Sequence, residues 1–257
     1  MLPSTPGVHM GSLRELLRYL RRRGTAAVGL DVHFSNDIEC SRLLLGNEGA
    51  RWCIWPDMIS ADSVVYTFGV GEDVSAELQL IRRFGLHVYA FDPTPRSVTW
   101  VRGQSFPPQF GFYEYGLAAF DGVASFQPPA NSLHVSHSMI MRHDHPAEVI
   151  HAPVRRLSAL MAELGHRHID VLKMDIEGAE YDVIDEVLKS GIVPGQWLIE
   201  FHHRWQEIGI EATRRAVASL RRNGYLLFYM SAVGQEFSFV NRIAFSETAR
   251  HGAAQSQ

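Results

Sequence analysis

Short apolar runs alternate with amphipathic stretches from residue 63 onward, a pattern typical of a mostly parallel sheet covered by helices on both faces. The run SVVYTFGV (63–70) predicts the first strand, and EDVSAELQLIRRFG (72–85) predicts a helix because its apolar residues recur at helical spacing. Gly85 is expected to end that helix in the left-handed conformation. The next strand, HVYAFD, ends at Asp92, and TPRSVTWV, with proline at its first helical position, begins a second helix.

The rest of the chain continues this alternation. A strand near QFGFYEYGLAAF and the run VASFQPP are expected to pair across a hairpin turn at Asp121 and Gly122. VIHAPVRRL is extended, and SALMAELG is a short helix that Ser158 caps and Gly165 ends. The elements that follow are a strand (168–175), a helix (179–191), a strand (196–201), a helix (211–224) and an antiparallel hairpin at the sheet edge (225–230 with 236–242).

Three regions lack this regular pattern. Residues 1–61 are interpreted as a helical and irregular cap on the main domain, which spans 62–245, and residues 246–257 as a flexible tail. The segment 128–146 has no clear period and predicts a long loop. Its histidines favour either a lid over a substrate or a plain surface loop, and the sequence does not separate the two.

Charge and targeting signals narrow the class of protein. The net charge of −4 over 257 residues argues against a nucleic-acid surface driven by charge. We see no apolar core of a signal peptide and no run of bilayer-spanning length, so stable membrane insertion is not expected. Two cysteines, Cys40 and Cys53, are too few for a disulfide framework, which favours a reducing, cytoplasmic setting. Nothing in the sequence sets the oligomeric state.

The basic run RELLRYLRRR (14–23) has two interpretations. It carries leucines at helical spacing, so it could form a helix that lies on a membrane or a partner. An ordinary amphipathic helix that packs against the domain through its leucines is favoured on composition.

The first strand, its loop and the second strand together predict a nucleotide-binding half-site. The loop has the form Gly69-Val70-Gly71, whose glycines allow a ligand to approach the backbone at the start of a helix. Asp92 lies at the carboxyl end of the next strand, where an acid can accept hydrogen bonds from ribose hydroxyls. Val74 occupies the place of the third glycine of a dinucleotide site, which disfavours NAD and FAD. S-adenosylmethionine, which has a ribose but no phosphate, fits the loop better.

Polar side chains also follow two later strands. DVLKMDIEGAE places Asp175 and Glu177 directly after an apolar run, and IEFHHR brings Glu200 and His202 to the end of the next strand. Ligands in open α/β sheets bind at such carboxyl ends. A histidine here is by itself most often a surface residue, but its position beside the acidic segment favours a functional role.

These segments, in this order, resemble the FkbM-type S-adenosylmethionine-dependent methyltransferases, with KMDIEGAE as the most specific element. The resemblance covers roughly residues 51–242. It implies an α/β, Rossmann-like, seven-stranded class I methyltransferase sheet, mostly parallel with an antiparallel C-terminal strand, and methyl transfer to a hydroxyl of a small molecule such as a sugar, a glycoconjugate or a natural product. By the same resemblance, Gly69, Val70 and Gly71 line the methionine end of the cofactor, Asp92 holds its ribose, Leu117, Ala118 and Asp121 lie near its adenine, and Asp175, Glu177, Glu200 and His202 border the reacting centre.

The chemistry requires removal of a hydroxyl proton, for which His202 is the first candidate base near neutral pH. Asp175 could orient that imidazole, act as the base itself or bind a metal. A magnesium ion held by Asp175 and Glu200, with Glu177 or His202 as further ligands, is the alternative chemistry.

Two other functions stay open. A nicotinamide-dependent oxidoreductase would share the first half-site, but it leaves KMDIEGAE unexplained. A non-catalytic binding module on the same fold is the second alternative, because a fold does not fix an activity.

Overall fold

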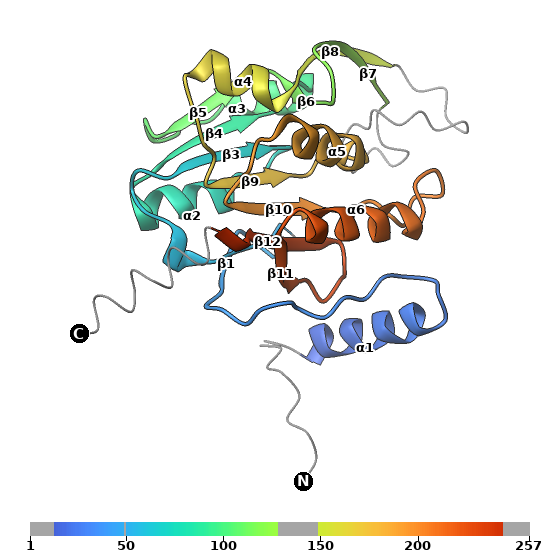
Figure 1. Ribbon diagram of the computed structural model, residues 1–257. Helices are drawn as coiled ribbons and strands as arrows, with labels where there is room; N and C mark the ends of the chain where they lie inside the picture. Colours follow the sequence, from blue (N-terminus) through green and yellow to red (C-terminus); the bar gives the residue numbers. More distant parts are fainter. Residues whose placement is uncertain (1–12, 49, 128–148, 244–257) are drawn as a thin grey trace, which may run out of the picture.

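A computed structural model describes residues 13–48, 50–127 and 149–243, and its centre is a seven-stranded sheet (Figure 1). The strand order is β11-β12-β10-β9-β3-β4-β5. All neighbouring pairs are parallel except those of β12, which is antiparallel to both β10 and β11. The expected class I methyltransferase sheet is therefore confirmed. The strands are β3 (Val64–Phe68), β4 (His87–Phe91), β5 (Phe110–Tyr113), β9 (Val171–Met174), β10 (Gln196–Glu200), β11 (Tyr225–Met230) and β12 (Glu236–Asn241).

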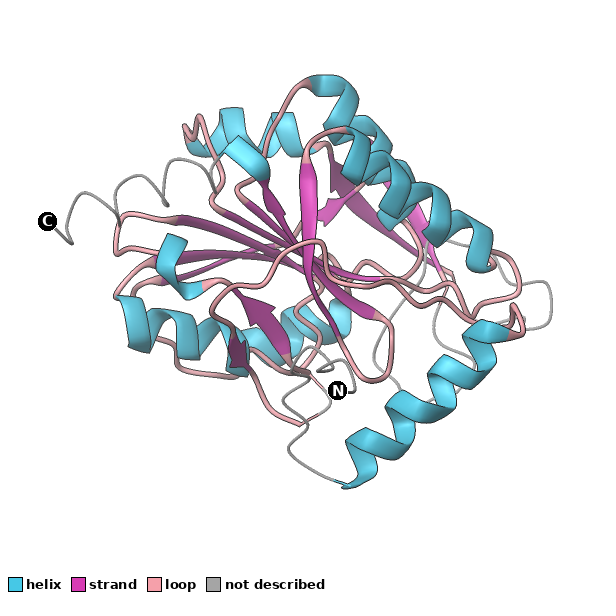
Figure 2. Ribbon diagram, turned by 60° about the horizontal axis from the view of Figure 1, so that its bottom comes forward, coloured by secondary structure: helices cyan, strands magenta, loops and turns pink. Residues whose placement is uncertain are grey.

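Helices cover both faces of this sheet, as Figure 2 shows with the strands seen between two helical layers. One face packs on α4 (Leu157–Leu164), α5 (Glu180–Ser190) and α6 (Ile210–Arg222) around a core that includes Trp197. The other face packs on α2 (Ser75–Phe84) and α3 (Pro95–Arg102) around Val65 and Leu198. Because both faces are covered, the central strands are mostly apolar, as the runs in the sequence predicted, with Thr67 and Lys173 as buried exceptions.

Local sequence signals set several helix ends. Gly85 ends α2 with a φ of 72° and Gly165 ends α4 with a φ of 74°, as predicted. The prediction that Ser158 caps α4 is wrong, because the helix begins at Leu157 and Arg156 occupies the N-cap. Thr94 is the N-cap residue of α3, but its hydroxyl donates to Asp92 and accepts no N–H of the helix.

A small three-stranded sheet lies beside the main one. It consists of β6 (Gly116–Leu117), β7 (Gly122–Phe126) and β8 (Ile150–Arg155), with β8 in the middle. The predicted hairpin between the segments on either side of Asp121 is therefore wrong, since β6 and β7 each pair with β8 and not with each other. Asp121 explains the arrangement, because its carboxylate accepts hydrogen bonds from the backbone N and Nε of Arg156, just after β8.

The N-terminal part of the described chain contains a helix, a long connection and a hairpin. The helix is α1 (Leu13–Ala27), and β1 (Leu43–Leu45) pairs antiparallel with β2 (Trp52–Ile54), followed by the short helix η1 (Pro56–Met58). The hairpin is fixed to the sheet by Gln196, whose side chain bonds both the N–H and the carbonyl of Trp55. The expectation of a helical and irregular cap thus missed this hairpin.

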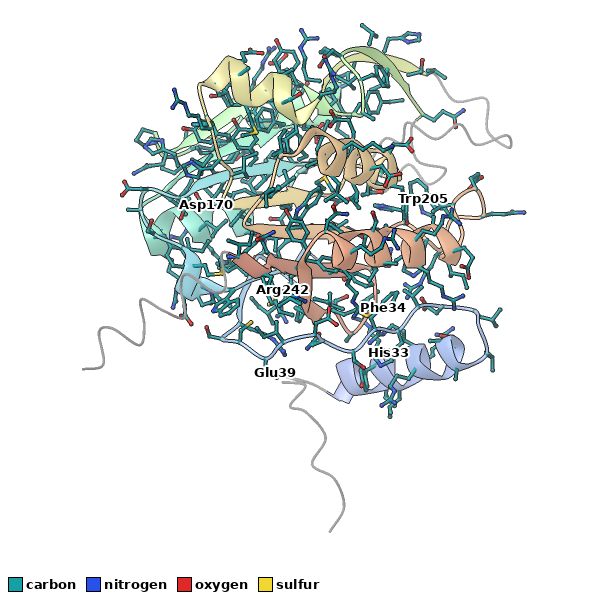
Figure 3. The ribbon with its side chains drawn as sticks, in the orientation of Figure 1. His33, Phe34, Glu39, Asp170, Trp205 and Arg242 are labelled. Carbon is teal, nitrogen blue, oxygen red and sulfur yellow. The ribbon has the colours of Figure 1, made fainter. Side chains whose placement is uncertain are left out.

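The connection between α1 and β1 runs along the outer strand of the sheet, where Figure 3 labels His33, Phe34 and Glu39. The Asp37 N–H donates to the Leu227 carbonyl at 2.7 Å, and the Leu227 N–H donates to the Asp37 carboxylate at 2.9 Å. Arg221 holds the same carboxylate. The exposed edge of β11 is therefore partly covered by the chain itself.

Helix α1 does not pack as its sequence predicted. Leu17 and Leu20 are 58% and 54% exposed, whereas Arg22 is 4% exposed. The expectation that the leucines attach this helix to the domain is wrong for these two residues. Within the described ranges, no helix is long and apolar enough to cross a membrane. The expected loop at 128–146 and the tail at 246–257 lie outside the described residues.

Candidate active site

The carboxyl ends of β3, β4, β9 and β10 surround a cavity of about 280 Å³. Figure 3 marks the direction of the sheet, because Asp170 precedes β9 and Trp205 follows β10 at the opposite end. The cavity lies where ligands bind in open α/β sheets. Its lining contains the predicted residues Gly69, Val70, Gly71, Asp92, Leu117, Asp175, Glu177 and Glu200.

Of the predicted site residues, His202 does not line the cavity itself, but it lies beside Asp175 and Glu177, which do. Two further residues, Ala118 and Asp121, lie elsewhere. Ala118 is buried and is not part of the cavity lining. Asp121 forms an ion pair with Arg156 at 2.8 Å and is also absent from the lining. The structure therefore places neither beside the cavity, although Leu117 from the same segment does reach it.

The tips of β3 and β9 meet at Gly69. Gly69 has a φ of 83°, and a Cβ added to it would lie 1.8 Å from the carbonyl oxygen of Asp175. The Asp175 N–H in turn donates to the Phe68 carbonyl at 3.1 Å. Only glycine permits this approach, so the glycine loop and the acidic segment are fixed together at one end of the cavity.

Asp92 organises the glycine loop. One of its carboxylate oxygens accepts the N–H groups of Val70 and Gly71, both at 3.0 Å. The other accepts the backbone N–H and the hydroxyl of Thr94 at 2.9 and 2.7 Å. A carboxylate has about four acceptor positions, so protein donors already occupy this side chain. Contact with a ribose stays a prediction, while its role in shaping the loop is visible.

Replacing Asp92 by asparagine is expected to weaken S-adenosylhomocysteine binding at least about tenfold and to destabilise the fold by about 1–3 kcal/mol. The amide nitrogen would face two of the N–H donors that the carboxylate now satisfies. Calorimetric titration and urea unfolding measure the two effects. Asp62→Asn, on an exposed turn, is the matched control. Unchanged affinity and stability in Asp92→Asn would contradict this role.

The start of α2 differs from the expected anion site. The first helical N–H, that of Ser75, already donates to the Asp73 carboxylate at 2.7 Å. A ligand at the start of this helix therefore meets one N–H that a side chain of the protein already occupies. The remaining lining of the cavity must supply the other contacts to a ligand.

A buried ion pair lies beneath the glycine loop. Lys173 Nζ lies 3.3 Å from Glu77 Oε1 and donates to the Gly69 carbonyl at 3.2 Å. The same ammonium lies 4.8 Å from the centre of the Trp52 ring. Both charged side chains are almost fully buried, so Lys173 couples α2 to the loop that borders the cavity.

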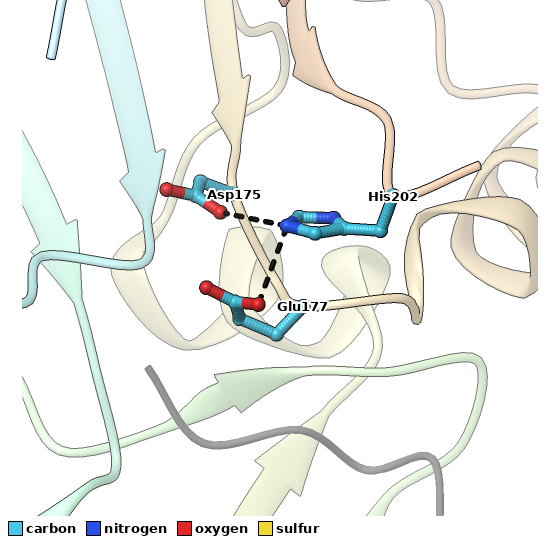
Figure 4. A group of neighbouring side chains, drawn as sticks. All are labelled: Asp175, Glu177 and His202. Atoms are coloured by element: carbon cyan, nitrogen blue, oxygen red, sulfur yellow. Dashed lines mark ion pairs between the residues drawn. The ribbon is translucent and has the colours of Figure 1, made fainter. Parts of the chain in front are cut away.

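Acidic side chains surround His202 at the end of β10. Its Nε2 lies 3.3 Å from Glu177 and 3.8 Å from Asp175, as drawn in Figure 4. Its Nδ1 lies 3.0 Å from Glu180, which is fully buried. The imidazole is therefore fixed at one nitrogen and directs the other toward the two carboxylates of the acidic segment.

Glu180 also shapes that segment. Its carboxylate accepts the N–H groups of Ile176 and Gly178 at 3.1 and 3.0 Å. Between them, Glu177 has a φ of 54°, a conformation that costs free energy for a residue with a side chain. These hydrogen bonds hold Glu177 in that conformation and direct it toward His202.

The carboxylates determine the charge of the histidine. Burial by itself lowers the pKa of the His202 imidazole, but the three carboxylates outweigh burial and raise that pKa to about 10. His202 is therefore positively charged at neutral pH, and the expectation of a neutral ring there is wrong. Burial also raises the pKa of Asp175, of Glu200 and of Glu236 above their ordinary values, with neighbouring acids adding to the effect.

This cluster makes stability depend on pH. The pKa of His202 is 6.5 ordinarily and about 10 in the fold, so its stabilisation is complete below pH 6.5 and is lost as pH rises through about 10. The raised pKa values of the carboxyl groups also make the free energy of unfolding fall as pH rises above their ordinary pKa range. We expect the free energy of unfolding to fall between pH 7 and 10, and to fall less in His202→Gln. Urea unfolding across this range checks it, with exposed His168→Gln as the control; equal pH dependence in all three proteins would contradict it.

Asp175, Glu177 and His202 also form a group whose ligand atoms lie within 4.8 Å of one another. Two carboxylates and an imidazole are a mixed donor set, whereas magnesium prefers oxygen ligands. The predicted partner Glu200 is not in this group. The residues therefore do not fit the predicted magnesium ion.

Comparison with known proteins agrees with this arrangement of loop, sheet and acidic segment. The methyltransferase FkbM domain model matches residues 61–227. The chain belongs to the methyltransferase FkbM domain family. In this FkbM-domain chain, the matched segment contains the glycine loop, Asp92, the acidic segment and His202.

The curated relatives of this FkbM-domain chain include probable methyltransferase-like protein 24 from Rattus norvegicus, which is 26% identical over 282 residues, covering 89% of this chain and 76% of the relative. The human protein of the same name is 29% identical over 109 residues, covering 37% of this chain and 30% of the relative. Among solved structures, a methyltransferase FkbM from Methylobacillus flagellatus is 12% identical with a TM-score of 0.44, covering 71% of this chain and 44% of that chain.

Several residues of this FkbM-domain site were given no role from the sequence. Glu180 fixes His202, Lys173 and Glu77 support the glycine loop, and Glu236 joins the cavity lining from β12. Glu180 lies within the acidic segment that drew attention, so its position there was a usable signal. Glu77 and Glu236 carry no such signal, because each looks like an ordinary residue of its helix or strand.

Proposed function

We propose that this protein is an S-adenosylmethionine-dependent methyltransferase that methylates a hydroxyl oxygen of a small acceptor, such as a sugar, a glycoconjugate or a natural product. One observation carries the proposal. The glycine loop shaped by Asp92 meets Asp175 and Glu177 at a single cavity, and His202 lies directly beside those two carboxylates. Membership in the methyltransferase FkbM domain family supports the reaction class.

The cavity suits a cationic cofactor with an aromatic part. Acidic side chains Asp175, Glu200 and Glu236 lie on its lining, and Phe68 and Phe91, stacked at 4.5 Å, form an apolar portion. Asp175 Oδ1 is buried and accepts no hydrogen bond from the described residues, so it is an acceptor in need of a partner. S-adenosylmethionine supplies an electrophilic methyl group on a positively charged sulfur when it is bound.

Asp175 is the best-placed base for the acceptor hydroxyl. Its raised pKa makes it a stronger base than an ordinary carboxylate, and the residue lines the cavity. His202, held as a cation by Glu180, lies 3.8 Å away and favours the charged form of Asp175. Glu177 lies beside the same imidazole nitrogen and also stabilises its positive charge. This assignment exchanges the roles that the sequence analysis favoured, with the histidine as orienting partner and the aspartate as base.

Calorimetric titration with S-adenosylhomocysteine and with NADH tests the cofactor class. We expect binding of the first and none of the second, because Val74 closes the place of the third dinucleotide glycine with a buried side chain. Binding of NADH alone would support the oxidoreductase alternative and contradict the proposal.

An acceptor screen with radiolabelled methyl donor tests the reaction. Sugars, glycolipids and polyketide alcohols are the acceptors to include, each with and without a metal chelator. Label in a base-stable ether product supports hydroxyl methylation, and label in a nitrogen or carbon product contradicts it. Cofactor binding without transfer to any class of acceptor would favour the binding module. Loss of transfer on chelation would show that a metal takes part.

A further inference from the structure

Helix α1 presents leucines to solvent. Leu17 and Leu20 are more than half exposed, and Val28 and Leu30, directly after the helix, are 70% and 73% exposed. Four large apolar side chains within fourteen residues thus lie on one outer part of the molecule. Figures 1 and 2 both show α1 outside the two helical layers that cover the sheet. Exposed apolar side chains gathered on one surface favour an interaction site.

A buried arginine fixes this orientation of the helix. Arg22 is 4% exposed and donates to the sulfur of Met230 at 2.9 Å and to the carbonyl of Val32 at 3.5 Å. Its Cδ would lie 2.3 Å from a Cβ at Gly234, so glycine makes room for the side chain there. The polar residue therefore packs inward and the leucines point outward, which reverses the usual packing of an amphipathic helix.

A basic hollow of about 610 Å³ adjoins these leucines. Four arginines line it, together with Leu30 and Val233, and its one acidic lining residue is Asp31. The Asp31 carboxylate is already paired with His203 and Arg204, both at 2.9 Å. In contrast, Arg22 Nε is buried and has no hydrogen-bond partner among the described residues. A buried donor without an acceptor points to an anionic ligand. The four arginines are Arg18, Arg21, Arg22 and Arg204.

We propose that α1 docks this protein on an anionic lipid bilayer, with the leucines at the boundary of the acyl chains and lipid phosphates in the arginine-lined hollow. Charge complementarity favours a lipid surface over a second copy of this chain. Although the net charge of the chain is −4, its α1 surface is basic, so the α1 surfaces of two copies would repel each other. The exposed residues Leu17 and Leu20 are each followed by an exposed arginine, Arg18 and Arg21. Apolar contacts and phosphate contacts therefore lie at adjacent depths, as in helices that lie in a membrane interface. This docking is independent of the proposed methyl transfer.

Vesicle flotation of the full chain tests the proposal. The probes are vesicles of phosphatidylcholine alone and of equal parts phosphatidylcholine and phosphatidylglycerol. We expect binding only to the second kind, and less of it as salt concentration rises. Arg18→Gln with Arg21→Gln should lower the partition coefficient about thirtyfold, since each basic side chain near the surface contributes about 1 kcal/mol. Leu17→Gln with Leu20→Gln should lower it at least about tenfold.

Matched controls come from other parts of the surface. Arg82→Gln with Arg83→Gln removes the same charge from α2, and Val123→Gln with Val193→Gln removes exposed apolar side chains elsewhere. Neither should change vesicle binding more than about twofold. Free glycerophosphoglycerol at high concentration should not displace the protein, because the leucine contacts need a bilayer.

Four outcomes would overturn the proposal: no binding to anionic vesicles, equal binding to both kinds of vesicle, equal losses in the controls, or displacement by the soluble headgroup. A protein that sediments as a dimer, becomes a monomer on Leu17→Gln with Leu20→Gln and ignores vesicles would instead assign this surface to a second copy. All substituted side chains are exposed, so thermal unfolding should be unchanged.

Discussion

Asp175→Asn is expected to lower kcat for methyl transfer by about 10² to 10⁴. Asparagine preserves the shape of the side chain but cannot accept the proton of the acceptor hydroxyl. The affinity for S-adenosylhomocysteine should change much less, since the glycine loop and Asp92 remain in place. Initial rates at saturating acceptor, with calorimetry of the same protein, measure both quantities.

Two variants sharpen this test. Asp185→Asn, on the exposed side of α5, is the matched control and should keep the wild-type rate. His202→Gln removes the positive charge that lowers the pKa of Asp175. The acid side of its pH–rate profile should therefore move to higher pH. If His202 were the base, the wild-type rate would instead rise until the imidazole loses its proton near pH 10. A wild-type rate in Asp175→Asn would remove this residue from the mechanism.

Lys173→Met is expected to destabilise the fold by about 3–5 kcal/mol. Glu77 is 1% exposed, and the substitution leaves its carboxylate buried without a cation. The Gly69 carbonyl also loses its ammonium donor, so the affinity for S-adenosylhomocysteine should fall. Urea unfolding gives the stability, and calorimetry gives the affinity.

The double variant Lys173→Met with Glu77→Leu separates charge from packing. Removing both charges should recover most of the lost stability, because no charge is left buried and unpaired. It should not recover cofactor affinity, since the Gly69 carbonyl still lacks its donor. Lys189→Met, an exposed lysine of α5, should change neither quantity. A single variant as stable as the wild type would show that Glu77 does not depend on Lys173.

The fold was predictable because its signals are local. Apolar runs on a doubly covered sheet and glycines that end helices are written in consecutive residues, as Gly85 and Gly165 show. The position of the site was predictable for a related reason. Parallel strands place their carboxyl ends at one edge, so Asp92 and Asp175 were expected at one cavity and both line it.

Features that depend on distant partners were not predictable. The charge of His202 depends on Glu180, twenty-two residues earlier, and the acidic segment gave no sign that this carboxylate turns toward His202. The contact between Asp121 and Arg156, which accompanies the pairing of β7 with β8, joins residues thirty-five positions apart. The leucines of α1 predicted that the apolar side of the helix faces the domain. Instead Arg22 faces the domain and bonds Met230, while Leu17 and Leu20 are exposed. Periodicity shows that a helix has two faces and not which one packs.

The bond between Asp37 and Leu227 has a consequence for any shortened version of this chain. Because β11 is the outermost strand, its backbone groups are a template for pairing with a neighbouring molecule. The residues after α1 block part of that template and are themselves anchored by Arg221. A protein that began after residue 42 would keep the matched family region. It would, however, expose the edge of β11, and two molecules could then associate by pairing these edges.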